Sequence, residues 1–183
     1  MSGYNGWLAE EAKGPCPHYE DARDCFLRGV HILTVEANGR QNGMAVASVT
    51  QASHNPPLLS VAVATQQYTH ELLYQATHFA ICSLRIDQLD VASHFGESSG
   101  RDGDKLRAVP TQIGQTGVPL LQDCLVFYEC KKYATLPAGD HTIFLGEIAN
   151  KGIVKQGKQL PYSRFDYKSQ SVIKYKEGDT SGS

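Results

Sequence analysis

Apolar and β-branched residues gather in short segments along this chain of 183 residues, and turn-forming or polar clusters separate the segments. Runs of this length and composition predict β-strands. We expect six strands, at residues 30–36, 41–52, 58–64, 78–84, 125–135 and 142–154.

Turn-forming residues predict how these strands connect. Asn38-Gly39 is a strong signal for a two-residue hairpin, so the first two strands are expected to pair antiparallel. Asn55-Pro56-Pro57 ends the second strand, because proline cannot donate a ladder hydrogen bond. The segment LPAGDH, residues 136–141, is expected to join the last two strands.

Helical patterns are few and short. Residues 19–28 place apolar residues three and four apart, a second helix is expected to begin near Thr69, whose hydroxyl can cap it, and a third covers residues 87–95. The segment 96–119 is rich in glycine, serine and charge and reads as one long connection. Connections of this length in compact domains are usually functional.

Strands therefore outnumber helices by about two to one, and no long helix is predicted to cover a sheet. A sheet of this kind hides its edges by curling on itself, so the pattern predicts a closed or nearly closed antiparallel barrel. We expect an irregular arm at residues 1–18, one domain at 19–175 and a flexible tail at 176–183.

Composition narrows the function classes. The formal net charge of −2 argues against a general affinity for nucleic acid. The chain has neither an apolar run long enough to span a membrane nor a signal-peptide pattern at its start, and its five cysteines include no C-x-x-C pair. We expect a cytoplasmic protein with reduced thiols, and the histidine spacing predicts no metal site.

Two segments stand out chemically, and local sequence leaves two interpretations of each. Residues 45–49, AVASV, are small enough to be a strand packed closely on a neighbour, or to leave room for a flat ligand read by peptide groups. Thr69 at a helix N-terminus could help to bind an anion or could be only a cap, and Glu71 close by would repel a phosphate.

Several motifs in unbroken order resemble one known family. They are G-V-H-I-L-T-V, N-G-M-A-V-A-S-V-T-Q-A-S-H-N-P-P, V-A-V-A, H-F-A-I-C-S-L, H-F-G-E-S-S-G-R-D-G-D-K-L, P-L-L-Q-D-C-L-V-F-Y-E-C and A-G-D-H-T-I-F-L-G-E-I, within residues 22–155. Together they resemble the flavin reductase-like FMN-binding split-barrel family, including flavoredoxin and the flavin reductase module of diflavin flavoproteins. The resemblance implies a Greek-key split β-barrel that binds FMN or, alternatively, FAD.

The resemblance also implies which residues contact the flavin. The segment after N-G-M lines the flavin ring through main-chain groups, and the loop after the third strand holds the ribityl chain and phosphate. Relatives often have Thr-Ala-Ser-Ser-Phe where this chain has AVASV, so only one hydroxyl of that set is retained. The corresponding positions are Ala45, Val46, Ala47, Ser48, Val49, Gln51, Ala52, Gln66, Gln67, Tyr68, Thr69 and His70.

Charge and the G-D-H motif add three candidates. The phosphate loop contains neither lysine nor arginine, so Arg101 or Lys105 is expected to help it, the alternative being that both are solvated loop charges. Cys82 stands where relatives commonly have asparagine and is expected to be a small buried residue. His141 matches the histidine that relatives place beside the nicotinamide, although Asp140 and His141 could also only cap a turn.

The implied activity is hydride transfer from NADH or NADPH to flavin, which depends on proximity and orientation and requires no acid–base residue. The alternatives are a flavoredoxin-like electron carrier with tightly held FMN and a protein redox partner, and a non-enzymatic module that binds another ligand. Relatives are typically homodimers, so we expect a homodimer and a monooxygenase or redox protein that receives the electrons.

Overall fold

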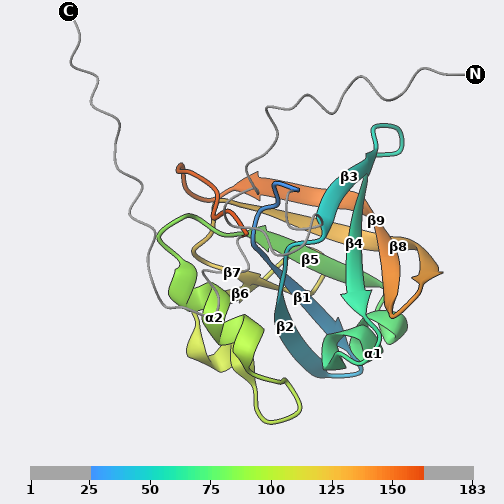
Figure 1. The fold of residues 1–183 in the computed structure, drawn as a ribbon, viewed down its shortest axis with the longest axis horizontal. Coiled ribbons are helices and arrows are strands. Elements are labelled where there is room, and N and C mark those ends of the chain that lie inside the picture. The colour runs from blue at the N-terminus through green and yellow to red at the C-terminus, as the bar shows by residue number, and fades with distance from the viewer. Residues whose placement is uncertain (1–25, 163–183) are drawn as a thin grey trace, which may run out of the picture. The chain divides into compact units, whose positions relative to one another are not determined.

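The computed structural model describes residues 26–162, and residues 28–162 form one compact unit (Figure 1). The predicted arm at 1–18 and the predicted tail at 176–183 lie outside the described residues. Most of the predicted helix at 19–28 also lies outside them, and its last three residues are not helical.

Seven strands form one sheet in which every neighbouring pair is antiparallel. The mainly β, antiparallel class predicted from the sequence is therefore confirmed. In spatial order the strands are β2 (Arg40–Val46), β1 (His31–Ala37), β5 (His78–Ser83), β8 (Val126–Ala138), β9 (His141–Ile153), β4 (Leu58–Ala64) and β3 (Val49–Ser53).

The hairpins follow the turn signals. Asn38 and Gly39 both have positive φ, at 54° and 76°, as a tight turn between β1 and β2 requires. The last hairpin is longer than expected, because β8 continues to Ala138 and β9 already begins at His141, with Gly139-Asp140 between them.

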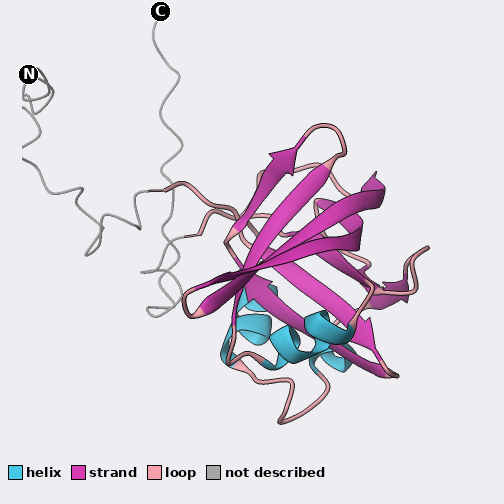
Figure 2. Ribbon diagram, turned by 90° about the vertical axis from the view of Figure 1, so that its right-hand side faces the viewer, coloured by secondary structure: helices cyan, strands magenta, loops and turns pink. Residues whose placement is uncertain are grey.

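The two edge strands of the sheet are consecutive in the sequence. Only Ala47 and Ser48 separate β2 from β3, although five strands lie between these two in the sheet. The sheet must therefore curl until its edges approach, and Figure 2 shows the curvature. The prediction of one continuous strand over 41–52 is wrong, because the backbone leaves one edge here and joins the other.

Side chains from alternate strand positions fill the inside of the curved sheet. Leu33 and Val35 of β1, Val61 and Val63 of β4, and Phe144 of β9 are at most 1% exposed. Burial of each such side chain contributes roughly 1.5–3 kcal/mol. This core fixes which face of every strand looks outward, and hence which residues are available to a ligand.

Two helices cover one part of the sheet. Both α1 (Tyr68–Gln75) and α2 (Leu89–Glu97) pack against β1 and β2, and Figure 2 shows them on the same side of the curled sheet. The buried face of α1 includes Leu72 and Leu73, whereas that of α2 includes Ala92 and Phe95.

The long connection 96–119 is more ordered than the sequence predicts. It contains a short 3₁₀ helix, η3 (Lys105–Ala108), and strand β6 (Thr111–Ile113), which pairs with β7 (Pro119–Leu121). A buried carboxylate, Glu129 of β8, organises the turn of this hairpin.

Glu129 is fully buried, yet both of its carboxylate oxygens are well satisfied. Oε1 accepts from the Thr116 backbone N–H at 2.7 Å and the Thr116 hydroxyl at 2.6 Å, while Oε2 accepts from Gln115 N at 3.2 Å and Asn150 Nδ2 at 2.6 Å. Burial raises the pKa of Glu129, but these hydrogen bonds outweigh it and hold the pKa below its usual value. The charged carboxylate therefore ties the β6–β7 turn to β8 and β9.

Candidate functional site

The N-terminus of α1 follows β4 directly and carries no side-chain cap. Gln67 is the N-cap residue in an extended conformation, and its side chain makes no capping hydrogen bond. The expectation that Thr69 caps the helix is wrong, because Thr69 lies inside the first turn and is 2% exposed. The first backbone N–H groups of α1 thus have no side-chain partner, which is the arrangement that binds anions.

The Thr69 hydroxyl is used instead for a contact with β2. It accepts a hydrogen bond from Asn42 Nδ2 at 2.8 Å, and Asn42 is itself 3% exposed. Gly100 packs so closely on the Asn42 amide that a Cβ at residue 100 would overlap it. Asn42 therefore holds the start of α1 and the loop that contains Arg101 together.

Arg101 extends from that loop to the N-terminus of α1. Its Nη1 donates to the Gln66 carbonyl at 3.3 Å, and its guanidinium carbon lies 5.5 Å from the centre of the Tyr68 ring. Its Nη2 forms an ion pair with Glu71, at an exposed position for both side chains. The structure thus brings Arg101 to the predicted phosphate loop, although Glu71 competes for its charge.

Lys105 lies elsewhere. Its ammonium donates to the carbonyls of Phe95 at 3.1 Å and Ser98 at 3.0 Å, so it caps the C-terminal end of α2. Burial lowers the pKa of Lys105 to about 8. The side chain is 6% exposed and makes no contact with residues 65–70 among the hydrogen bonds of the described chain.

The β8–β9 turn lies beside the same loop. Both the backbone N–H and the hydroxyl of Thr65 donate to the Asp140 carbonyl, at 3.0 and 3.2 Å. His141 Nδ1 is 2.7 Å from Asp140 Oδ1, and this hydrogen bond lowers the pKa of Asp140. The His141 side chain is 40% exposed, and the turn before it lies next to the predicted phosphate loop.

His70 is already committed within the fold. Its Nε2 is 2.9 Å from Thr142 Oγ1, and its ring packs against Tyr74 and Phe144. Burial lowers the pKa of His70, so this ring is a neutral link between α1 and β9.

The crossing between β2 and β3 lies along β4. Ala62 N donates to the Ser48 carbonyl at 3.1 Å, two residues before Ala64, which pairs with His141 of β9. With about 3.3 Å per residue, Ala62 and Ala64 are roughly 7 Å apart along β4, and Ser48 and His141 lie on opposite sides of this strand. The outward residues of β4 here are Ala62 and Ala64, so no bulky side chain occupies this surface.

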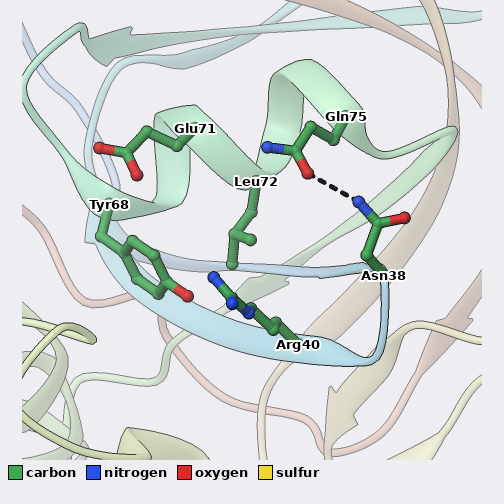
Figure 3. Close-up of a pocket in the computed structure, with 6 residues that line it drawn as sticks. All are labelled: Asn38, Arg40, Tyr68, Glu71, Leu72 and Gln75. Atoms are coloured by element: carbon green, nitrogen blue, oxygen red, sulfur yellow. Dashed lines mark hydrogen bonds between the residues drawn. The ribbon is translucent and has the colours of Figure 1, made fainter.

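The predicted flavin residues do not all border one cavity. Val49 and Gln51 line a cavity of about 490 Å³ on the concave side of the sheet, together with His31, whose Nδ1 is 2.8 Å from Ser83 Oγ. Tyr68 lines a separate pocket of about 270 Å³ (Figure 3). Neither lining includes the remaining predicted positions, namely Ala45, Val46, Ala47, Ser48, Ala52, Gln66, Gln67, Thr69, His70, Arg101, Lys105 and His141.

Sequence reasoning missed two contributors to this region, namely Asn42, which positions the loop residues, and Arg40, which lines the pocket beside Tyr68. Glu71 was expected to repel a phosphate, and the structure adds that it pairs with Arg101. A signal existed for Asn42, since it is the first residue of the N-G-M motif.

Cys82 is fully buried, as expected from the sequence. None of the helices in residues 26–162 is long and apolar enough to cross a membrane.

Comparison with known proteins places this geometry in a family. Residues 23–171 match the family described as flavin reductase like domain. The FMN reductase (NADH) SmoA of Agrobacterium fabrum is 36% identical over 130 residues, which are 71% of this chain and 72% of that protein. The high molecular weight rubredoxin of Moorella thermoacetica is 31% identical over 139 residues, which are 75% of this chain but 61% of the rubredoxin.

A solved structure agrees with the fold. The NADH:FAD oxidoreductase SgcE6 of Streptomyces globisporus C-1027 superposes with a TM-score of 0.71 at 30% identity, over 75% of this chain and 82% of that one. This chain therefore belongs to the flavin reductase like domain family.

Proposed function

We propose that this chain is a flavin reductase that transfers hydride from NADH or NADPH to FMN or FAD. The observation that carries the proposal is the position of Arg101 beside the uncapped N-terminus of α1. A helix N-terminus without a side-chain cap and one guanidinium together suit a phosphate group. The relatives named as NADH-dependent FMN and FAD reductases support the same activity.

The residues present fit a flavin phosphate that binds and leaves. One arginine serves the loop, Lys105 is held by α2, and Glu71 already pairs with Arg101. A phosphate must therefore compete with a carboxylate for the same cation, which weakens binding. This competition favours an exchangeable flavin over the alternative, an electron carrier with permanently held FMN.

Other residues would shape the rest of the site. Residues 45–48 offer peptide groups and little bulk beside Ala62 and Ala64, so a flat ring has room there. Asp140 fixes the orientation of His141 through Nδ1 and leaves Nε2 toward a ligand, such as a nicotinamide amide. Bound flavin would supply the hydride acceptor, while these residues bind and orient the two ring systems.

We also propose a cytoplasmic homodimer that delivers reduced flavin to a monooxygenase or another redox protein. An exchangeable flavin requires such an acceptor. The outer part of the β8–β9 hairpin exposes Tyr133 and Leu136, at 57% and 59%, which suits a subunit contact. Light scattering that gave a monomer at micromolar concentration would contradict the dimer without affecting the proposed activity.

The experiment is NADH and NADPH oxidation by the full chain with added FMN or FAD. Arg101→Met is expected to raise the KM for FMN about tenfold, because a charge-assisted hydrogen bond contributes about 1.5 kcal/mol. Arg107→Met is the matched control, since Arg107 is 88% exposed and pairs only locally with Asp104. Oxidation no faster than with free flavin alone would refute the proposal, and flavin that stays bound through gel filtration would favour the electron carrier.

A further inference from the structure

A pocket lies between α1 and the β1–β2 hairpin, outside the surface described for the flavin ring. Its volume is about 270 Å³, and its lining consists of Asn38, Arg40, Tyr68, Glu71, Leu72 and Gln75. Figure 3 shows Arg40 reaching from β2 toward the Tyr68 hydroxyl, with Leu72 extending from α1 toward the Arg40 guanidinium. Leu72 is buried and the polar groups are exposed, so the pocket has an apolar floor and a polar rim.

The charge of this pocket is positive once its ion pair is counted. Glu71 is paired with Arg101, whereas the Arg40 guanidinium has no hydrogen-bond or ion-pair partner within residues 26–162. Two arginines and one carboxylate leave a net charge of +1 around Tyr68. An unpaired guanidinium at the rim of a pocket is suited to a phosphate or a carboxylate.

The amide groups of the pocket provide a second kind of contact. Asn38 Nδ2 donates to Gln75 Oε1 at 2.8 Å, which fixes the orientation of both side chains. Figure 3 shows the Gln75 amide nitrogen on the opposite side from Asn38, toward Leu72. This N–H₂ group is left free to donate to a ring nitrogen, as side-chain amides do to adenine, while Leu72 and the Tyr68 ring offer apolar surface to a base.

Size and position select the ligand. Pockets for complete drug-sized ligands occupy about 300–1,000 Å³, so a pocket of about 270 Å³ takes one nucleotide portion and not a complete dinucleotide. Tyr68 is shared with the Arg101 cluster, and Gln75 is seven residues further along α1, roughly 10 Å at 1.5 Å per residue. A ligand held by its phosphate at Arg101 could therefore place an attached base against Gln75.

We propose that this pocket binds the adenosine phosphate portion of a dinucleotide, with Arg40 on the phosphate and Gln75 on the adenine. The inference rests on the proposed function, because it extends from the phosphate site at Arg101. The adenosine phosphate of FAD and that of NADH or NADPH share this chemistry. Arg40 would then determine whether the protein prefers FAD to FMN, or how tightly it binds the pyridine nucleotide.

The test compares dissociation constants of FMN, FAD and AMP for the full-length wild-type chain, Arg40→Met, Arg40→Lys and the control Arg107→Met. In wild type, FAD is expected to bind more tightly than FMN, and AMP alone to bind measurably. Arg40→Met should raise the dissociation constant of FAD about tenfold, and Arg40→Lys should raise it less. The dissociation constant of FMN should change less than twofold in both variants. A tenfold rise in the KM of NADH or NADPH in Arg40→Met, with FAD unaffected, would assign the pocket to the pyridine nucleotide.

Two outcomes would overturn the proposal. The first is an equal effect of Arg40→Met on FMN and FAD, with KM for both nucleotides unchanged. The second is a combination of three results. The wild-type chain binds no measurable AMP, it binds FMN and FAD with equal affinity, and Arg40→Met leaves the KM values for NADH and NADPH unchanged. If the wild-type chain does not bind FMN, the proposed function is refuted instead. Measurement of AMP binding would still test the pocket on its own.

Discussion

Glu129→Gln is expected to destabilise the fold, because the carboxylate receives four hydrogen bonds in a fully buried position. Glutamine has nearly the same shape, but its amide nitrogen must face one of the two donor pairs. Two hydrogen bonds to a charged acceptor are then lost, each contributing at least about 1.5 kcal/mol. The free energy of unfolding should fall by roughly 3 kcal/mol, which corresponds to roughly 10 °C in Tm.

The pH dependence of this difference tests the cause. The pKa of Glu129 is lower in the folded chain than the usual value of about 4.3 for an unfolded chain. Its stabilising contribution is therefore complete above pH 4.3 and is lost as the pH falls through the lower folded pKa. The gap between wild type and Glu129→Gln should shrink under those acidic conditions.

Urea unfolding followed by circular dichroism measures both effects. Glu97→Gln is the control, since Glu97 is exposed at the end of α2 and its replacement should change stability by less than about 0.5 kcal/mol. If Glu129→Gln does not fold, Asn150→Ala removes one donor to Glu129, together with the acceptor for Lys151 N, and should cost at least about 1.5 kcal/mol. A gap below 0.5 kcal/mol at neutral pH would refute the reasoning.

Two further predictions concern the core. Burial lowers the pKa of His31 to about 4, so the unfolded chain takes up a proton first and the free energy of unfolding should decline as the pH falls from about 6.5 toward 4. His31→Gln should reduce this decline in urea midpoints, His70 contributing the remainder, and an equal decline in both proteins would contradict the reasoning. Gly146→Ala would put a Cβ 2.6 Å from Cys130 Cβ and 2.8 Å from Phe79 Cε1, which should lower the free energy of unfolding by about 1–3 kcal/mol. The control Gly103→Ala meets nothing within 4 Å and should be neutral, so equal effects of the two substitutions would count against the packing argument.

Local sequence signals predicted most strands because those signals reside within the strands themselves. Asn38-Gly39 specifies its turn through positive φ angles, and LLSVAVA is an apolar run in which buried and half-buried residues alternate from Ser60 to Ala64 of β4. The β6–β7 hairpin was missed because its turn depends on Glu129, which lies beyond the hairpin in the sequence. No local pattern within residues 111–121 contains that information.

The candidate site could be predicted only in part for the same reason. The family resemblance and the charge pattern predicted that Arg101 assists the phosphate loop, with a solvated loop charge as the alternative, and the structure places Arg101 within hydrogen-bond distance of Gln66 in that predicted loop. Lys105 was an equal candidate in the sequence, but the carbonyl groups at the end of α2 hold it. The partner of Thr69 is 27 residues away at Asn42, so a cap was the natural local interpretation.

The two residues between β2 and β3 also limit how this chain can change. One residue inserted between Val46 and Val49 would turn the side chains of β3 to the opposite face, because strand side chains alternate with a period of two. An insertion at Gly139-Asp140 would only lengthen a hairpin loop. Between β2 and β3, the length of the connection is therefore restricted more tightly than the identity of its residues. Substitutions are tolerated there, whereas insertions are not.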